Sequence, residues 1–483
     1  MKPAVRERLP ATGHDRIKGT KADVVISGGT VVLPLGVRPD SCLVIRGERI
    51  SEILESGAPR PAAKLTIDAR GKLVLPGIVD AHVHVDTPGP PEKPLGVYSD
   101  SFESMSRAAA FGGVTTVIPF IFANGKKHPA RYLEDYQAQA RREAWTDFGF
   151  HFGIARDLDV EAIPDVVKLG VRSFKGFMAY KRQGNMVSDR LLARAMEEAG
   201  RCRGLMMVHA EDGELIDALE ERMKNSGDCT PPAYARCRPS AAENIAIIRA
   251  LAIARETECV LYIVHLSTRE GLETAKEARG RGQPVVIETC PQYLFLTAAE
   301  LEPDRLGPLA KIGPPLRPPG HGDALWSAVR DGSIDIIASD HAPRLKNDKL
   351  IGLRDIFAAP FGGPGLETLL PVVYDEFQRR YLSLTVLARV MSEMPARVFG
   401  LYPQKGVIAV GSDADIAIVD PEVRWSVASD KLQTNAKYSV FEGRHVVGKP
   451  VTTLVRGKPV VLDGKASDGP GWGKFLAHDR VLD

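Results

Sequence analysis

IVDAHVH, residues 78–84, is an apolar run that ends in two histidines, and its composition is that of a strand buried on both faces. Seven similar runs follow, and amphipathic stretches such as RLLARAMEEAGRC separate most of them. Strands that alternate with helices predict a parallel sheet, and eight such units over about 260 residues fit an α/β fold of the (β/α)8 TIM-barrel type. The later runs are VTTVIPF (114–120), FGFHFGIA (148–155), VRSFKGFM (171–178), GLMMVHA (204–210), CVLYIVHL (259–266), VVIETC (285–290) and IDIIASD (334–340).

An open, doubly wound sheet is the alternative to a barrel. That fold would carry a glycine-rich phosphate loop after its first strand. No such loop follows residues 78–84. We therefore expect a closed barrel.

The two flanks of the barrel region have the texture of a small β-domain. Residues 22–75 contain short alternating runs, such as ADVVISGG and KLTIDA, separated by glycine and proline. A similar pattern returns in GVIAVGSDADIAIVD (406–420) and continues to Gly464. We expect both flanks to join in one β-sandwich. The predicted divisions are a disordered basic tail (1–20), the N-terminal segment of the β-sandwich (21–75), the barrel (76–400), the C-terminal segment of the β-sandwich (401–465) and a C-terminal tail (466–483).

The bulk composition argues against several kinds of partner. The 483 residues are 44% apolar and 26% charged, with a net charge of +2. This balance gives no electrostatic reason to expect nucleic acid or a membrane surface as the partner, and no apolar run has the length of a membrane span. The basic start of the chain lacks the apolar segment of a secretion signal. The six cysteines form no CxxC pair, so we expect a reduced, cytoplasmic protein.

Polar side chains stand where the predicted strands run out. The C-terminal strand ends of a barrel surround one mouth, where catalytic groups collect. Imidazole and carboxylate are good ligands for Zn2+ and related ions, so this group predicts a metal site. His341 directly follows the candidate ligand Asp340 and can lie near the site, whereas we expect the other histidines to be structural. The candidate residues are His82, His84, Lys175, His209, His265 and Asp340.

Lys175 is the least expected member of this group, because an ammonium ion beside metal ions would be repelled. One interpretation is that Lys175 pairs with a nearby acid. The other is that its pKa is lowered and that the neutral amine takes up CO2. The resulting carbamate would be an anionic oxygen ligand that bridges two metals.

Seven motifs extend this pattern along the chain: PGIVDAHVH (76–84), SFKGFMAYK (173–181), MVHAEDGELI (207–216), YIVHLS (262–267), ETCPQYLFLT (288–297), GPPLRPP (313–319) and SDHAP (339–343). Together they resemble the cyclic amidohydrolases of the amidohydrolase superfamily. The most similar branch is that of D-hydantoinase and dihydropyrimidinase, with allantoinase and dihydroorotase as neighbours. SFKGFMAYK and TCPQYL are specific to this branch, whereas HVH marks only the superfamily. The resemblance runs from about residue 22 to residue 460.

The resemblance implies a site with two divalent metal ions, usually zinc. His82, His84 and Asp340 match the ligands of one ion. His209 and His265 match the ligands of the other. A carboxylated Lys175 matches the bridge, together with a hydroxide. A homodimer or homotetramer is also implied.

The same resemblance implies the reaction. The metal-bridging hydroxide attacks the ring carbonyl of a hydantoin or dihydropyrimidine-like substrate, and the cyclic amide opens to an N-carbamoyl amino acid. Tyr180 matches a phenol that donates a hydrogen bond to the developing oxyanion. Asp340 matches a general base that becomes the general acid. The backbone of Gly313 and the loop 360–367, with Phe361 and Gly362, match the groups that bind the imide edge of the substrate.

Three positions depart from the family pattern. Dihydroorotases have an arginine two residues after the HxH pair, where this chain has Asp86. If Asp86 faces the pocket, it repels a substrate carboxylate, so we expect dihydroorotate to be a poor substrate. Phe361 stands where hydantoinases usually have asparagine, and Gly313 stands where they usually have serine. Contacts made through the main chain would survive both changes.

Three other interpretations remain open. The first is an allantoinase-type or dihydroorotase-type ring opening at the same site. The second is a metal-free, dihydropyrimidinase-like scaffold protein that binds the cytoskeleton, but such relatives have lost metal ligands and this chain keeps all six expected positions. The third is a mononuclear deaminase on the same barrel, which would not need Lys175.

Overall fold

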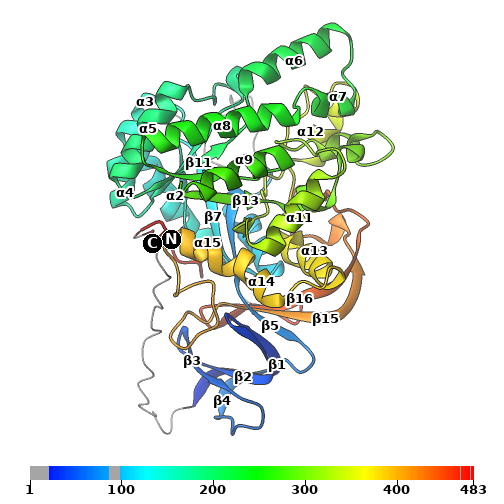
Figure 1. The fold of residues 1–483 in the computed structure, drawn as a ribbon. Coiled ribbons are helices and arrows are strands. Elements are labelled where there is room, and N and C mark those ends of the chain that lie inside the picture. Colours follow the sequence, from blue (N-terminus) through cyan, green and yellow to red (C-terminus); the bar gives the residue numbers. More distant parts are fainter. Residues whose placement is uncertain (1–20, 86–97, 124, 468, 479, 483) are drawn as a thin grey trace.

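A ring of parallel strands forms the centre of the larger domain (Figure 1). The computed structural model describes residues 21–85, 98–123, 125–467, 469–478 and 480–482. Every neighbouring pair of strands in the ring is parallel. The predicted (β/α)8 barrel is thereby confirmed. Its strands are, in order, β6 (Ile78–His84), β7 (Val114–Ile121), β9 (His151–Gly153), β10 (Ser173–Phe177), β11 (Leu205–His209), β12 (Val260–Ile263), β13 (Val285–Thr289) and β14 (Ile336–Ile337), with β8 (Asp147–Phe148) beside β7.

The ring closes between its last and first strands. Val83 of β6 forms a parallel bridge with His341, and the backbone N–H of His84 donates to the carbonyl of His341 at 2.7 Å. All seven residues of β6 are buried, as expected for a strand covered on both faces. The closure brings the end of β6 directly beside the segment that follows β14.

Two strands end before the polar residue near the end of their apolar run. β12 ends at Ile263 and β14 ends at Ile337. His265 and Asp340 therefore lie two and three residues beyond their strands, with φ angles of 38° and 49°. Left-handed backbone is uncommon for residues other than glycine and often occurs at functional sites.

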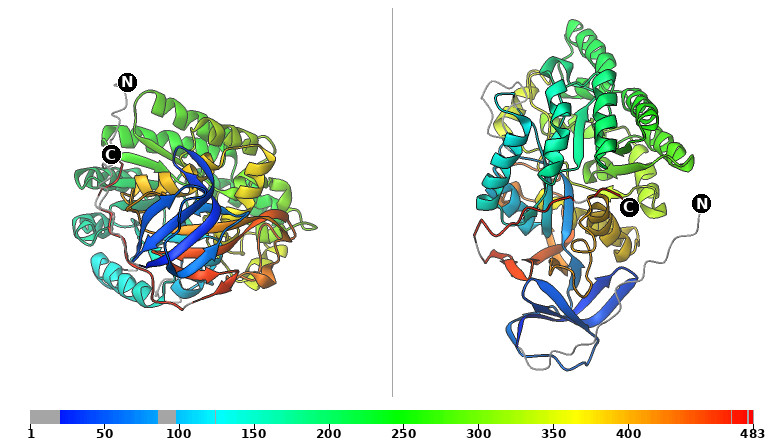
Figure 2. Two further views of the ribbon diagram at one scale, coloured as in Figure 1. Left: turned by 90° about the horizontal axis from the view of Figure 1, so that it is seen from below. Right: turned by 90° about the vertical axis from the view of Figure 1, so that its left-hand side faces the viewer.

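Helices cover the outside of the barrel (Figures 1 and 2). In α5 the buried residues recur at helical spacing, from Leu191 to Ala199, and the hydroxyl of Ser188 caps the helix by accepting from the N–H of Leu191. No helix of the described residues is long and apolar enough to cross a membrane. The longer helices are α1 (Phe102–Phe111), α2 (Pro129–Glu143), α5 (Asp189–Arg201), α6 (Gly213–Asn225), α8 (Ser240–Glu256), α9 (Arg269–Gly280), α11 (His321–Asp331) and α13 (Leu366–Arg379); shorter ones are α3 (Asp157–Glu161), α4 (Ile163–Lys168), α7 (Pro231–Arg236), α10 (Pro291–Phe295), α12 (Lys346–Leu350), α14 (Leu384–Ala388) and α15 (Met394–Val398).

The second domain is built from both flanks of the barrel, as the sequence predicts (Figure 1). β5 and β15 pair antiparallel, with Leu75 opposite Ala417, and join the early strands to the late ones. The strand order is β18-β17-β16-β15-β5-β1-β2-β3, with β4 paired to β1. The strands are β1 (Ala22–Leu33), β2 (Gly36–Arg46), β3 (Arg49–Leu54), β4 (Ala63–Asp68), β5 (Leu73–Pro76), β15 (Ile416–Ser426), β16 (His445–Val455), β17 (Lys458–Leu462) and β18 (Lys465–Ala466).

A buried ion cluster joins the two domains. The amine of Lys405, which is fully buried, lies 2.5 Å from a carboxylate oxygen of Asp147, 2.7 Å from Asp415 and 3.0 Å from Asp413. Arg456, which lies between β16 and β17 of the second domain, also pairs with Asp147 of the barrel strand β8. Loss of one partner from such a cluster typically costs about 3–5 kcal/mol, because the remaining charges stay buried.

The C-terminal segment, expected only as a tail, lies against the barrel. The N–H of Leu476 donates to the carbonyl of Phe148 at 2.8 Å, and the N–H of His478 donates to Gly170 at 2.8 Å. The side chains of Leu476, His478 and Val481 are buried. Residues 1–20, for which we expect a disordered tail, lie outside the described residues.

Candidate metal centre

The six candidate ligands meet at one pocket in the mouth of the barrel. The pocket is lined by all six of them, and also by the candidate substrate-binding residues Tyr180, Gly313, Phe361 and Gly362. Asp86, the remaining candidate, lies outside the described residues. The structure thus brings together side chains that are spread from β6 to the segment after β14. The other residues of the lining are Tyr98, Phe177 and Ala342.

Three of the candidates form a compact group. His82 and His84 both point from β6 toward Asp340, whose Oδ1 atom lies 3.1 Å from Nε2 of His82 and 3.5 Å from Nε2 of His84. The ligand atoms of the three residues all lie within 4.8 Å of one another. Donors bound to one tetrahedral zinc ion, at about 2.0–2.2 Å from it, lie about 3.4 Å apart. The spacing therefore fits a single divalent cation.

His209 and His265 form a second pair beside this group. Nδ1 of His209 lies 2.9 Å from Nε2 of His265. The other ring nitrogen of His209, Nε2, lies 2.8 Å from the carboxylate of Glu211, which fixes the ring's orientation. Histidine ligands are commonly held in this way, by a carboxylate on the nitrogen that does not bind the metal. The two facing nitrogens are a donor pair of the right type for a second cation.

Lys175 lies on β10 with its amine buried beneath the pocket. Its Nζ atom has no hydrogen-bond partner among the described residues, and it lies 4.9 Å from the ring centre of Phe120 and 5.2 Å from that of Phe177. Lys175 forms no ion pair with an acid among the described residues, so the structure does not support the interpretation that it is paired. Burial lowers the pKa of the Lys175 amine to about 7, although Glu288 and Asp340 act in the opposite direction.

Sequence reasoning missed two buried carboxylates that hold these ligands. Oε1 of Glu288, on β13, lies 2.6 Å from Nδ1 of His82. Glu211 lies between His209 and the guanidinium of Arg238, which is 2.6 Å away. Burial raises the pKa of Glu288 to about 7; at Glu211 burial acts in the same direction, but Arg238 and His209 outweigh it and bring the pKa to about 2. An acid inside the apolar run VVIETC was the available signal for Glu288.

Aromatic rings and glycines form the wall opposite the ligands. Tyr180, with a φ angle of 70°, stacks on Phe361 at 4.7 Å between ring centres, and its buried hydroxyl has no hydrogen-bond partner among the described residues. A Cβ atom on Gly313 would lie 2.4 Å from that hydroxyl, and one on Gly362 would lie 2.4 Å from the carbonyl of Ala342. The close approach of Tyr180 gives a local reason for glycine at position 313.

Two further histidines near the mouth have structural partners. His341 turns its ring to Asp100, 3.1 Å away, and accepts from the N–H of Gly365. The ring of His151 lies 2.6 Å from the hydroxyl of Ser173 and 2.9 Å from the carbonyl of Ala81. Neither lines the pocket. Both rings are thus used to connect elements of the barrel.

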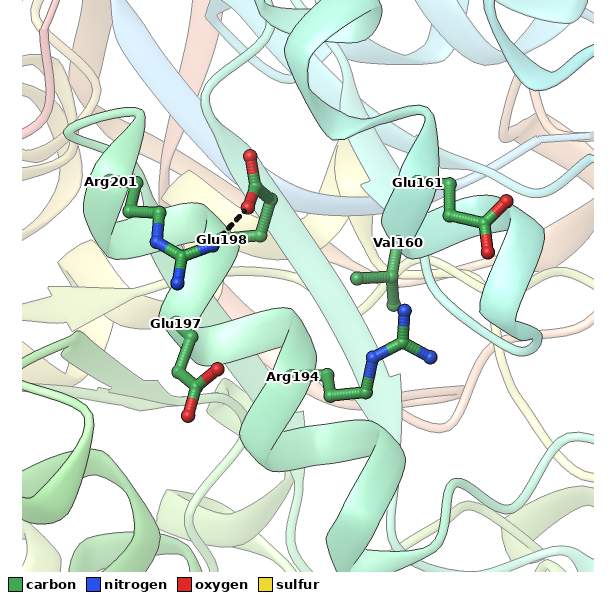
Figure 3. Close-up of a pocket in the computed structure, with 6 residues that line it drawn as sticks. All are labelled: Val160, Glu161, Arg194, Glu197, Glu198 and Arg201. Carbon is green, nitrogen blue, oxygen red and sulfur yellow. Dashed lines mark hydrogen bonds and ion pairs between the residues drawn. The ribbon is translucent and has the colours of Figure 1, made fainter.

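Another hollow lies on the outer surface of the barrel (Figure 3). Four of its six lining residues belong to α5, and Arg201 and Glu198 pair across one turn at 3.1 Å. Arg194 pairs with Asp157 beside it. None of the six is a candidate site residue. The buried set of candidate metal ligands at the carboxyl ends of the barrel strands, rather than this hollow, indicates that the protein belongs to the class of barrel enzymes.

Known proteins agree with this class. The sequence pattern of the Amidohydrolase family matches residues 73–460. A D-hydantoinase of Ralstonia pickettii is 38% identical over 95% of this chain and 99% of its own length, and an allantoinase of Rubrobacter xylanophilus is 35% identical over 95% and 98%. The crystal structure of dihydropyrimidinase from Brevibacillus agri is 34% identical and superposes with a TM-score of 0.89, covering 95% of this chain and 99% of that one. The chain therefore belongs to the amidohydrolase family.

Proposed function

We propose that this protein hydrolyses the ring amide of a hydantoin or dihydropyrimidine-like compound to an N-carbamoyl amino acid. The observation that carries the proposal is the convergence of His82, His84, Lys175 and Asp340 with the pair His209 and His265 on one pocket. Similarity to the D-hydantoinase and the dihydropyrimidinase over nearly the whole chain supports this class of substrate.

We further propose that the site holds two divalent cations, with zinc as the first choice. His82, His84 and Asp340 would hold one ion, and His209 and His265 the other. Two features support this assignment: the buried Nε2 of His82, which faces Asp340, has no hydrogen-bond partner of good geometry among the described residues, and imidazole with carboxylate is a donor set that zinc accepts. When bound, such ions lower the pKa of a water molecule and polarise a carbonyl group.

Lys175 would serve as the oxygen ligand between the two ions. Its neutral amine adds to the carbon of CO2 and releases a proton, which leaves a carbamate with a negative charge. The apolar surroundings of Nζ and its lack of an acidic partner within the described chain support this chemistry. A permanent ammonium ion at this place would be both desolvated and repelled.

The remaining residues would bind the ring and move the proton. Asp340 would take a proton from the attacking water and deliver it to the ring nitrogen as the C–N bond breaks. The Tyr180 hydroxyl would donate to the oxygen of the attacked carbonyl, where negative charge develops. Backbone groups of Gly313, Phe361 and Gly362 would meet the imide edge of the ring, and the Tyr180–Phe361 stack would form one wall.

A substrate panel tests this proposal. The zinc-loaded enzyme is assayed with both enantiomers of a 5-substituted hydantoin and with dihydrouracil, allantoin and dihydroorotate. We expect turnover of hydantoin or dihydrouracil, loss of that turnover on chelation, and poor use of dihydroorotate because of Asp86. Preferred turnover of allantoin would favour the second candidate, which the similarity to the allantoinase supports. Activity on none of these rings would reject the proposal.

Two further assignments accompany the function. We propose a homodimer or homotetramer, as the family resemblance implies. We also propose a cytoplasmic location, which the six free cysteines support. Light scattering of the purified protein tests the first of these.

A further inference from the structure

Two lysines are buried behind the wall of the pocket, away from the candidate ligands. Lys349 belongs to the short helix α12 and is fully buried. Lys311 directly follows the 3-10 helical turn Gly307–Ala310 and is 5% exposed. Among the described residues, both amines donate to backbone carbonyl groups, and neither has a carboxylate within ion-pair distance. Burial lowers the pKa of the Lys349 amine well below its ordinary value, with Lys311 and Arg344 adding to the effect. A buried amine without a counter-ion is costly unless its hydrogen bonds are needed.

The amine of Lys349 connects two segments that line the pocket. It donates to the carbonyl of Lys311 at 2.5 Å and to the carbonyl of Gly362 at 2.8 Å. Lys311 lies two residues before Gly313, and Gly362 is itself part of the pocket lining. The N–H of Gly362 also donates to the carbonyl of Lys311, at 3.0 Å. These three hydrogen bonds hold the Gly313 segment and the Gly362 segment at a fixed separation.

A second donor acts on the same loop from another side. The hydroxyl of Tyr438 donates to the carbonyl of Gly362 at 3.0 Å. The amine of Lys311, in contrast, donates to the carbonyls of Ile356 and Ala359, at 2.6 and 2.5 Å. Those two residues are not part of the pocket lining. The two lysines are therefore similar in burial and in acceptors, but only the amine of Lys349 bonds to a residue of the pocket lining, Gly362.

We propose that Lys349 is a positioning residue for substrate binding: through its bonds to Lys311 and Gly362 it sets the gap between the two backbone segments that receive the imide edge of the ring. This inference rests on the proposed function, which gives those segments their substrate contacts. A ring held by backbone groups on two separate segments binds well only when their spacing is fixed. The amine of Lys349 fixes the spacing of the Gly313 and Gly362 segments and does not itself contact the substrate.

The test compares Lys349→Met with the matched control Lys311→Met. Methionine has a similar volume and no donor, so both variants lose two bonds to carbonyl groups. We expect Lys349→Met to raise KM for the hydantoin about tenfold with kcat changed less than threefold. We expect Lys311→Met to lower the melting temperature but to change KM less than twofold. A loss of folded enzyme alone would lower apparent kcat and leave KM unchanged, so equal KM values in the two variants would overturn the inference.

Two additional measurements cover the remaining outcomes. If Lys349→Met does not fold, Tyr438→Phe removes one donor to the same carbonyl, and we expect a two- to fourfold rise in KM; an unchanged KM would overturn the inference.

If the wild type hydrolyses no ring in the panel, the proposed function fails, and amide hydrogen exchange tests the role of Lys349 separately. Faster exchange confined to residues 361–363 in Lys349→Met, but not in Lys311→Met, supports the inference, and uniform exchange in both overturns it.

Discussion

The Nδ1 atom of His82 lies 2.6 Å from Oε1 of Glu288, and this contact leaves Nε2 of His82 facing Asp340. Glu288 also accepts from the hydroxyl of Tyr262 at 2.6 Å and from the backbone N–H of His265 at 2.8 Å. One buried carboxylate therefore fixes the ring of one candidate ligand and the backbone of another. The orientation of both would be set before any metal arrives.

Replacement of Glu288 by glutamine tests this role. The amide oxygen cannot accept from all three donors, so His82 loses its fixed ring orientation. We expect the affinity for zinc to fall about 10–100-fold. Transfer of zinc to a competing chelator measures the change. Glu367→Gln is the control, because burial also raises the pKa of Glu367 to about 7 but its carboxylate accepts from Gln433 and not from a candidate ligand. Equal zinc affinities in the two variants would contradict the role of Glu288.

A substitution of Lys175 separates a bridging ligand from a structural lysine. Lys175→Ala removes the amine that would carry the proposed carbamate and leaves a cavity beneath the pocket. We expect it to lose at least one of two bound metals and most of its activity, and to recover some of both with acetate or propionate, since these carboxylates enter the cavity. Lys175→Met is the control, because its side chain fills the same space and leaves no room for the acid. Metal content by mass spectrometry and turnover measure both effects, and a Lys175→Ala enzyme with full metal content would contradict the assignment.

Tyr180→Phe tests the phenol as an oxyanion donor. The stack on Phe361 needs only the ring, so substrate binding survives the change. A lost donor of this type costs ~3 kcal/mol in the transition state, or about 100-fold in kcat. We expect KM to change only a few-fold. Steady-state kinetics on the hydantoin measure the split, and a decrease in kcat smaller than about threefold would assign Tyr180 to the wall of the pocket alone.

Local patterns in the sequence were sufficient to predict the barrel and to select the candidate ligands. IVDAHVH and the later runs are apolar because barrel strands are buried on both faces, and their polar last residues face the mouth. The joining of the two flanks followed from their shared strand texture. Each of these patterns is visible within a short stretch of the chain.

Other features depend on contacts between distant residues. Glu288 and His82 are separated by 206 positions, so no local pattern pairs them. The left-handed turns that place His265 and Asp340 beyond their strands carry no glycine as a signal. The C-terminal segment lies on the barrel through a few buried side chains that follow no strand or helix period. Its irregular spacing is why it looked like a tail.

His478 is a buried titratable residue of that segment, and its pKa is shifted. Burial lowers its pKa from 6.5 to about 4, with a contribution from Arg172, whose side chain donates to the His478 carbonyl at 3.1 Å. The folded protein therefore favours the neutral ring. Between pH 6.5 and pH 4 the unfolded chain binds the proton and the folded chain does not, so this contribution to stability is present above pH 6.5 and is lost as the pH falls toward 4.

We therefore expect His478→Leu to make the protein less sensitive to acid. A pKa difference of this size corresponds to ~3 kcal/mol over the full window. Melting temperatures at about pH 7 and about pH 4.5 measure it: the wild type should lose more stability than His478→Leu across this interval. His445→Leu, which removes an exposed histidine of β16, is the control and should follow the wild type. A wild type and a His478→Leu variant with parallel pH profiles would mean that the imidazole is protonated in the folded state, and that the C-terminal segment is held by its apolar side chains and backbone hydrogen bonds alone.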